Sequence, residues 1–511
     1  MKTAVAGIPS ALGERTPEAI QALVMSLRTQ LGRQRQHSAA LEAQLQDCPA
    51  HQAQQAARQA QVTALQAEVQ ELRVRLGQNA DNSSRPPSAD PPQAPSKAKA
   101  SPSGRKRGGQ PGHRGTFPAL LPSEQVDQVV CSVPEVCRHC QQPFPSTEPR
   151  RRARVWRRQV VELLTLAVHV PAYQMEARRC AHWGQRTRAS LPAGAPTGPF
   201  GPKLTAVVAM LSGKYRLSRR EVRQVVADLW QVAVSLGGVV RMQQVQSTAL
   251  KPVYAEVRAA VPQAGVVNMD ETGWREDKHR AWLWTVVTAA LTVFHIDRSR
   301  GGAVVEALLG PEFVGVAGSD RWSAYSRFAA ELRALCYAHL KRDFQALVDR
   351  GGAAEALGRW GVAAIERLFA LWRRFRDGEW DRKEVRRQLV PIQARMGRLL
   401  WRGEDSPDHK AAGLCRELTK WWAALWTLVR VAGVEPTTNV SERALRPAVL
   451  WRKRSFGSDS EAGSRFAERM LTVVATCRQQ GRQLLAFLVA AGEAAVQGSA
   501  APSLLPTRQG G

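Results

Sequence analysis

Two apolar runs that each lead into an aspartate constrain the fold of this chain more than any other feature. Residues 266–269 (Val-Val-Asn-Met) precede Asp270, and residues 313–319 (Phe-Val-Gly-Val-Ala-Gly-Ser) precede Asp320. Either aspartate alone has an ordinary explanation, because Asp commonly begins turns and helices. Two such strands in one chain instead predict carboxylates that converge. Converging carboxylates repel each other, so they predict a bound cation between them.

The sequence between the two aspartates completes the pattern of a sheet. Residues 281–287 and 291–296 predict two strands joined by a short turn, and residues 302–309 predict a helix. Three strands, a helix and a strand begin an RNase-H-like domain, so the predicted class is α/β with a mixed catalytic sheet. Oxygen ligands alone select Mg²⁺ or Mn²⁺. Two such ions support in-line phosphoryl displacement.

A third acid is expected from a later helix, and Glu442 is the candidate. It lies in the segment 436–447, Pro-Thr-Thr-Asn-Val-Ser-Glu-Arg-Ala-Leu-Arg-Pro. The competing explanation is a capping box, with Asn439 as N-cap and Glu442 at the third helical position. Basic residues surround this acid, as expected where a phosphate backbone approaches: Arg443, Arg446, Arg452, Lys453 and Arg454.

The stretch between Asp320 and Glu442 is too long for a minimal sheet domain. Its periodicity is almost entirely helical, which predicts a helical insertion over residues 344–433. The insertion would divide the catalytic core into residues 261–343 and 434–495. We expect the tryptophans of this region to be core residues rather than a base-stacking surface: Trp360, Trp372, Trp401, Trp421, Trp422 and Trp426.

The N-terminal part of the chain predicts helices followed by a linker. Apolar residues spaced three and four apart predict a coiled coil over residues 16–78, with two helices separated by Pro49; the spaced residues are Val62, Leu65, Val69, Leu72 and Leu76. A lone amphipathic helix folded onto its own domain is the alternative.

Residues 79–122 are crowded with Pro, Ser, Gly and basic residues, which predicts a disordered basic linker. It is either a solvated spacer or a phosphate-binding arm, whose candidates are Lys97, Lys99, Arg105, Lys106 and Arg107.

Cysteines predict a small zinc-ribbon-like segment over residues 123–190. Cys137-x-x-Cys140 has the spacing of a zinc-binding pair. The second pair is incomplete, because Trp183 stands where a thiol would follow Cys180. The zinc candidates are Cys137, Cys140, Cys180 and His182, with His139 and Cys131 as other sources of a fourth ligand. A metal-free remnant of such a segment is the alternative.

Residues 200–260 predict a group of helices. Ser218 is the expected N-cap of one helix, and residues 235–238 are expected to close or turn the next. One interpretation is a helix-turn-helix that directs Arg219, Arg220 and Arg223 toward DNA. Solvated basic helices are the alternative.

The formal charge of +28 favours a polyanionic partner, and nucleic acid before an anionic membrane. No apolar run approaches the ~20 residues of a membrane span, and we expect no signal peptide. Eight cysteines are too sparse for a disulfide framework. We therefore expect a cytoplasmic, nucleoid-associated protein without a membrane partner.

In this order, the motifs resemble those of the insertion-sequence-66 family of DDE-type transposases. The resemblance covers nearly the whole chain and rests on the segments 82–88, 109–115, 270–272, 320–325, 336–342 and 439–447. It implies a helical zipper, a zinc-binding segment and an RNase-H-like catalytic domain with Asp270, Asp320 and Glu442 as its triad. Trp183 departs from the paired Cys-x-x-Cys motifs of the family. His339 lies in a shared motif, and the sequence offers no physical argument for its role.

The resemblance implies a transposase that binds the terminal inverted repeats of a bacterial insertion sequence and catalyses metal-dependent strand cleavage and transfer. Its expected partners are the ends of the element, target DNA, further copies of the chain and small accessory proteins of the element. A catalytically silent DNA-binding protein derived from a transposase is the main alternative; Trp183 speaks for it and the intact triad against it. A general RNase-H-like nuclease or resolvase would need neither the zipper nor the linker motifs.

Overall fold

The computed structural model of the protein describes residues 17–46, 49–76, 78–79, 82–83, 120–132, 134–144, 157–163 and 167–506. The chain divides into two compact units. The first comprises Met1–Ala94, Lys341–Ala364 and Trp401–Leu414, and the second comprises Pro95–Leu340, Ile365–Leu400 and Cys415–Gly511.

A five-stranded mixed sheet forms the centre of the second unit, with strand order β5-β4-β3-β6-β7. The strands are β3 (Val266–Glu276), β4 (His279–Val287), β5 (Thr292–Asp297), β6 (Val316–Ser319) and β7 (Arg333–Leu335). β4 pairs antiparallel with both β3 and β5, whereas β6 runs parallel to both β3 and β7. Helix α7 (Gly302–Leu309) lies between β5 and β6 in the chain. This topology is consistent with the predicted RNase-H-like core.

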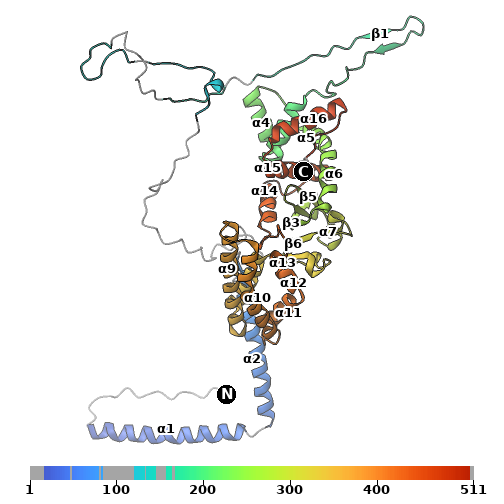
Figure 1. Cartoon of the computed structure of the whole chain (residues 1–511). Coiled ribbons are helices and arrows are strands. Elements are labelled where there is room, and N and C mark those ends of the chain that lie inside the picture. Colours follow the sequence, from blue (N-terminus) through green and yellow to red (C-terminus); the bar gives the residue numbers. More distant parts are fainter. Residues whose placement is uncertain are drawn as a thin grey trace. The chain divides into compact units, whose positions relative to one another are not determined.

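Helices cover both faces of the sheet (Figure 1). Three of them are α6 (Lys251–Ala260), α14 (Asn439–Ser455) and α15 (Glu461–Gln479). On one face, Val267 and Met269 pack in a core shared with α6 and α7. On the other face, Trp274 packs with Leu445 and Ala448 of α14. Because side chains alternate along a strand, Asp270 lies on the same face as Trp274, the face that α14 covers.

The helices that precede the sheet lie in the region where they were predicted. They are α3 (Pro202–Gly213), α4 (Arg219–Trp230), α5 (Leu236–Ala249) and α6. Ser218 caps α4 as predicted: its hydroxyl accepts the amide of Glu221 at 3.2 Å, and the Glu221 carboxylate accepts the amide of Ser218 at 2.6 Å. The expectation for residues 235–238 is wrong. Ser235 begins α5, because its hydroxyl accepts the amide of Gly238 at 3.0 Å.

Helices occupy the chain between β7 and α14, where the insertion was predicted. They are α8 (Tyr337–Arg350), α9 (Glu355–Arg376), α10 (Arg382–Gly403), α11 (His409–Lys420), α12 (Trp422–Leu425) and α13 (Thr427–Arg430). Trp372, Trp421 and Trp426 are buried, as expected of core residues. Trp401 is 72% exposed, so the core prediction is wrong there. Its neighbour Leu400 is buried, and successive helical residues point about 100° apart.

The first unit contains α1 (Pro17–Gln46) and α2 (Pro49–Leu76), so that Pro49 opens the second helix. Leu65, Val69 and Leu72 of the predicted heptad seam are exposed. The coiled coil itself stays a prediction. The end of α2 is bound to the end of α8, because Gln70 donates a hydrogen bond to the Arg350 carbonyl at 2.8 Å.

Most of the predicted linker, including all its candidate phosphate-binding residues, lies outside the described residues. The described residues 157–163 and 167–170 form no strand. A short hairpin lies further on and consists of β1 (Ala177–Arg179) and β2 (Arg186–Arg188), which pair with each other.

Helix α16 (Leu484–Gln497) is the last helix of the described chain. Among the described helices, none combines the length and the apolar character that a membrane crossing requires.

Candidate active site

The pairing of β3 with β6 sets the two predicted aspartates level with each other. Asn268 is the register partner of Gly318, and the same offset places Asp270 level with Asp320, directly after β6. The expectation that both aspartates end strands is correct for Asp320 and wrong for Asp270. β3 continues to Glu276 because its antiparallel pairing with β4 runs on after β6 has ended.

Glu442 lies near the start of α14, on the face of the sheet that carries Asp270. Thr438 is the N-cap, and within this fully described stretch its side chain makes no capping hydrogen bond. Glu442 is therefore the fourth helical residue, and the capping-box explanation with Asn439 as N-cap is wrong. The helix begins one residue earlier than the sequence suggested, so capping does not account for Glu442.

The three predicted acids share one electrostatic environment. Burial raises the pKa of Asp270 well above its usual value, and the carboxylates of Glu271, Asp320 and Glu442 raise it further. His339 acts in the opposite direction. The negative charges therefore lie close enough to disfavour one another, as expected for a site that a cation would stabilise.

Two of these carboxylates also accept hydrogen bonds from nearby backbone. Asp270 Oδ1 accepts the amide of Glu271 at 2.9 Å, and Asp320 Oδ1 accepts the amide of Trp322 at 2.9 Å. Among the residues that the structure describes, no three His, Cys, Asp or Glu side chains are arranged as a ready-made metal site. The acids are thus neighbours, and their role as metal ligands stays a prediction.

Glu271 points to the opposite face of β3 from the aspartate before it. Its side chain is 2% exposed, accepts the hydroxyl of Tyr325 at 2.5 Å and pairs with Arg300 at 2.8 Å. Burial raises the pKa of Glu271, while the hydrogen bonds from Tyr325 and Arg300 lower it. The guanidinium of Arg300 also stacks on Trp322, 3.8 Å from the ring centroid. These contacts tie the loop that follows Asp320 to the strand that carries Asp270.

His339 is the site residue for which the sequence offered no physical argument. Its Nε2 lies 3.8 Å from Oε1 of Glu442. Burial would raise the pKa of the Cys336 thiol, but hydrogen bonds with His339 and Thr438 lower it overall. The amide of Thr438 donates to Cys336 Sγ at 3.3 Å. Cys336 and His339 therefore connect the start of α8 to the start of α14, and the Cys-x-x-His spacing was the available signal.

Arg333 is a site residue that the sequence did not reveal. It is buried in β7, donates to the carbonyl of Asp320 at 2.9 Å and stacks on Trp421 at 4.4 Å. Burial lowers the pKa of Arg333 to about 10. This guanidinium holds the backbone of Asp320. The local sequence predicts neither the short strand β7 nor this contact.

The two cysteine turns of the predicted zinc segment have the same backbone hydrogen bonds. In each turn, the amide of the first cysteine donates to the carbonyl five residues later, at 2.8 Å for Cys137 and 2.7 Å for Cys180. The carbonyl of the same cysteine accepts the amide four residues later, at 2.9 Å in both turns. The fourth residue on, Gln141 or Gly184, is left-handed with φ of 58° or 63°. Trp183 thus stands at the second thiol position of its turn, where it is 84% exposed.

The described residues do not bring the zinc candidates Cys137, Cys140, Cys180 and His182 together as a metal site. The second turn keeps the backbone of a thiol-presenting turn without its second thiol. Zinc binding by this segment therefore stays a prediction.

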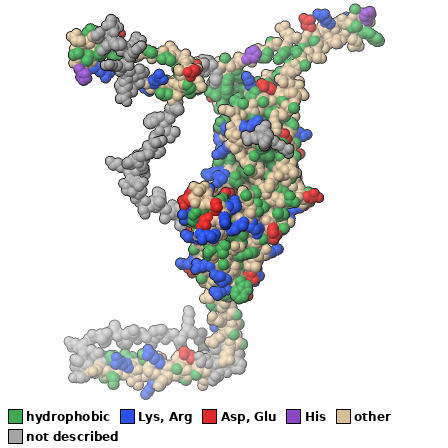
Figure 2. Space-filling model, viewed as in Figure 1, with side chains coloured by type: hydrophobic (Ala, Val, Ile, Leu, Met, Phe, Trp, Pro, Cys, Tyr) green, Lys and Arg blue, Asp and Glu red, His purple; other side chains and the backbone are tan. Residues whose placement is uncertain are grey.

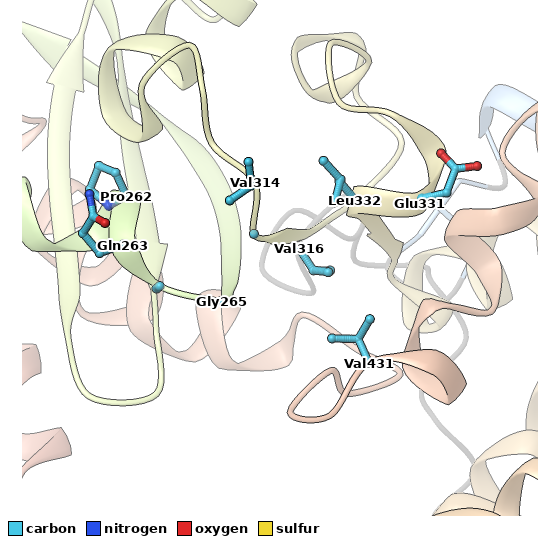
Figure 3. Close-up of a pocket in the computed structure, with 10 residues that line it drawn as sticks. Pro262, Gln263, Gly265, Val314, Val316, Glu331, Leu332 and Val431 are labelled. Carbon is cyan, nitrogen blue, oxygen red and sulfur yellow. The ribbon is translucent and has the colours of Figure 1, made fainter.

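A cavity of about 370 Å³ lies at the start of β3 and β6 (Figure 3), and Asp270 and Asp320 follow further along the chain from these starts. It is lined by Gly265 and Val316, where β3 and β6 begin, and by apolar residues such as Val314 and Val431. Glu331 is the one charged residue of this lining. The cavity is therefore separate from the acidic site.

The basic candidates of α14 divide into two kinds. Arg443, Arg446 and Lys453 are exposed. Arg452 is half-buried, donates to the Gly273 carbonyl and lies 3.3 Å from the hydroxyl of Thr272. The guanidinium of Arg452 therefore fastens α14 to β3, and a contact of Arg452 with DNA stays a prediction.

The basic candidates of α4, Arg219, Arg220 and Arg223, are all exposed. Their helix is fixed by the capping box at its start and by the buried residues Val222 and Val226 on its other face. Figure 2 shows Lys and Arg side chains spread over the visible face of the molecule, with fewer Asp and Glu among them. Such a surface suits a polyanion.

Comparisons with known proteins agree with this architecture. The model of the transposase IS66 family matches residues 197–466, and the model of a family of unknown function (DUF6444) matches residues 13–118. Two proteins of Sinorhizobium fredii (strain NBRC 101917 / NGR234) are similar. Uncharacterized protein y4qI is 27% identical over 236 residues, 41% of this chain and 42% of that protein. Uncharacterized protein y4jD is 26% identical over 289 residues, which are 50% of this chain and 55% of that protein. The chain thus spans about half the length of these relatives.

Proposed function

Because the chain belongs to the IS66 family of transposases, whose model covers residues 197–466, we propose that it is a DDE-type enzyme that cleaves and joins DNA at the terminal inverted repeats of a bacterial insertion sequence. The observation that carries this proposal is the acidic site: Asp270 and Asp320 lie level on neighbouring strands, and Glu442 on α14 shares their electrostatic environment. Target DNA, further copies of the chain joined through α1 and α2, and small accessory proteins complete the proposed partners.

Asp270, Asp320 and Glu442 are the residues that would hold Mg²⁺ or Mn²⁺. The fit rests on the chemistry of the donor set, which is three neighbouring carboxylates with oxygen ligands only. Burial and then the neighbouring carboxylates raise the pKa of Asp270, and a divalent cation beside it would offset both effects. Such ions, when bound, activate the attacking oxygen and stabilise the leaving oxygen of the phosphodiester. The protein orients the acids: Arg333 holds the backbone at Asp320, and His339 lies against Glu442.

The direct test is cleavage and joining of labelled DNA that carries the ends of the element, with Mg²⁺ or Mn²⁺ present. Specific cleavage at the ends followed by a joined product supports the proposal. Binding without any cleavage, even with the accessory proteins added, would instead favour a catalytically silent DNA-binding protein. Trp183 at a thiol position is the observation that favours this second function.

The acidic site is expected to lower the stability of the metal-free protein. Because the pKa of Asp270 is raised in the folded state, the fold favours its protonated form, and stability is lost as pH rises from the unfolded pKa through the folded pKa. We therefore expect Asp270→Asn to raise the melting temperature at pH 8 in EDTA, by about 2–4 °C for each kcal/mol recovered. Mn²⁺ should stabilise wild type more than the variant. Thermal melts at pH 8 and pH 4 would check both.

Asp459→Asn is the matched control, since Asp459 is exposed, and it should melt as wild type does. The difference between wild type and Asp270→Asn should shrink at pH 4, where the wild-type carboxyl carries its proton. A variant that melts below wild type at pH 8, or that gains as much from Mn²⁺, would contradict the assignment of Asp270.

The exposed arginines of α4 are expected to contact phosphates. Replacing Arg219, Arg220 and Arg223 together by glutamine should weaken binding to duplex DNA and reduce the slope of log affinity against log salt by up to about 2.7, since each phosphate contact contributes about 0.9. Fluorescence anisotropy between 50 and 200 mM salt measures this slope. Glutamine at Arg395 and Arg398, exposed on α10, is the control; an equal loss in both variants would refute a specific role for α4.

A further inference from the structure

Helix α14 ends in an exposed aromatic residue with an unfavourable backbone conformation. Phe456 follows the last helical residue and has φ 59° and ψ 11°, in the left-handed region. Its side chain is 73% exposed. Glycine is the usual residue at this position, because a side chain there costs free energy. Neither burial nor backbone preference therefore explains a phenylalanine at the end of this helix.

The loop that carries Phe456 is fastened to the β3–β4 hairpin. The amide of Ser458 donates to the Arg275 carbonyl at 2.9 Å, and the Ser458 carbonyl accepts the amide of Asp277 at 2.7 Å. Gly457 has φ 114°, and a Cβ at this position would lie 2.2 Å from the Arg275 carbonyl oxygen. The close approach requires glycine at 457. Phe456 is thus held outward by an ordered loop.

An exposed basic stripe leads along α14 from the acidic site to Phe456. Arg443, Arg446 and Lys453 are spaced by three and seven residues, which places them on one face of the helix. None of the three forms an ion pair with another described residue. The stripe begins next to Glu442 and ends three residues before Phe456, so the helix presents cations and then an aromatic ring.

We propose that Phe456 stacks on an unpaired base of DNA whose phosphate backbone follows the basic stripe of α14. This inference rests on the proposed function and names how that DNA is held. A solvent-exposed aromatic beside a row of cations is the arrangement with which proteins bind single strands, because every base has a face for stacking and every nucleotide a phosphate. The charge of the stripe selects a nucleic acid over an apolar protein surface.

The geometry of the helix sets where the stacked base lies. Fourteen residues separate Glu442 from Phe456, which corresponds to roughly 20 Å along a helix. In duplex DNA, successive nucleotides of one strand rise about 3.4 Å along the axis. An unpaired strand that keeps this stacked spacing reaches from the phosphate at the acidic site to Phe456 in about six nucleotides, so a terminus that is unpaired over that length is the fitting ligand.

The test compares two probes and three proteins. Full-length wild type, Phe456→Gly and Phe456→Trp are titrated with a fluorescein-labelled duplex that has a six-nucleotide single-stranded end, and with a blunt duplex of equal length. Phe456→Gly should lose about tenfold in affinity for the first probe, the value expected for one stacked base, and little for the second. Phe456→Trp should retain the affinity. 2-Aminopurine at the end of the overhang should be quenched by wild type and not by Phe456→Gly.

If Phe456 serves only as the helix cap, Phe456→Gly should bind both probes as wild type does. Glycine suits the left-handed conformation, so Phe456→Gly should melt above wild type in either case. If it also binds both probes as well as wild type does, or loses affinity equally for both, the proposal is overturned. Cleavage that requires Glu442 but ignores Phe456 would reject this inference alone. Stacking by a protein that never cuts its ends would reject the proposed function alone.

Discussion

Replacing Glu442 by glutamine is expected to reduce strand cleavage by at least about a thousandfold, because a metal-bound site contributes several kcal/mol to the stabilisation of the transition state. Glutamine has nearly the size of glutamate and lacks the negative charge that a divalent cation needs. The capping-box explanation no longer competes, because Thr438 is the N-cap and Glu442 is the fourth residue of α14. Cleavage of labelled element ends in Mg²⁺ or Mn²⁺ measures the effect, with circular dichroism and DNA binding to establish that the variant is folded.

Glu461→Gln is the matched control for this experiment. Glu461 also lies in the first turn of a helix, α15, and contributes through the helix dipole, an effect of about 0.3–1 kcal/mol on stability. Glu461→Gln should cleave as wild type does. Equal cleavage by Glu442→Gln would leave Glu442 with the same minor role and would require another acid. Asp270→Asn and Asp320→Asn should behave as Glu442→Gln does if the three act together.

Replacing Glu468 by alanine is expected to cost about 3–5 kcal/mol of folding stability, the usual result of removing one partner from a buried ion pair. The side chain of Glu468 is 0% exposed in α15. Its carboxylate lies 3.0 Å from His295 Nδ1 and 3.0 Å from Arg465, and it accepts the amide of Ile296 at 2.6 Å. Alanine would leave the buried Ile296 amide without its acceptor and Arg465 without its carboxylate partner. Urea denaturation measures the loss.

Two further variants calibrate the effect of Glu468. Glu468→Gln keeps an acceptor for the Ile296 amide and loses the charge, so it should fall between wild type and alanine. Glu312→Ala changes an exposed acid in the loop after α7 and should remain within about 0.5 kcal/mol of wild type. A loss below about 1 kcal/mol for Glu468→Ala would mean that the contacts of Glu468 with Arg465 and with the Ile296 amide do not stabilise the fold.

Local patterns predicted the elements that form the site but not the way in which they meet. The strands before both aspartates, the helix α7 and the helical insertion all follow from periodicity and turn residues, which act over a few positions. Ser218 was predicted as an N-cap because a serine precedes the helical pattern, and the structure adds a capping box with Glu221. Asn439 before Glu442 suggested a capping box and was misleading, because the N-cap is Thr438, one residue earlier.

Contacts between distant residues account for most of what was missed. Strand β7 has three residues, too few for a period, and it is formed because β6 is available to pair with it. Arg333 appears in the sequence as one more base in a basic chain, although it is buried against Asp320 and Trp421. Arg452 was expected near DNA for the same compositional reason, and only the structure shows that it fastens α14 to β3.

The sequence by itself indicated the class of the fold, three candidate acids and the basic character of the chain, since these follow from local hydrophobic patterns, from the order of the motifs and from charge. Only the tertiary structure decided which groups are neighbours. The offset of the parallel β3–β6 pair places Asp270 level with Asp320, and the packing of α14 on one face of β3 brings Glu442 there while Glu271 faces away. The left-handed conformation of Phe456 was also decided by the tertiary structure. The loop that follows it is hydrogen-bonded to Arg275, and this contact, rather than the local residues, imposes the conformation. Strand pairing and helix packing of this kind join residues far apart in the chain, and a local sequence pattern does not show which residues will meet.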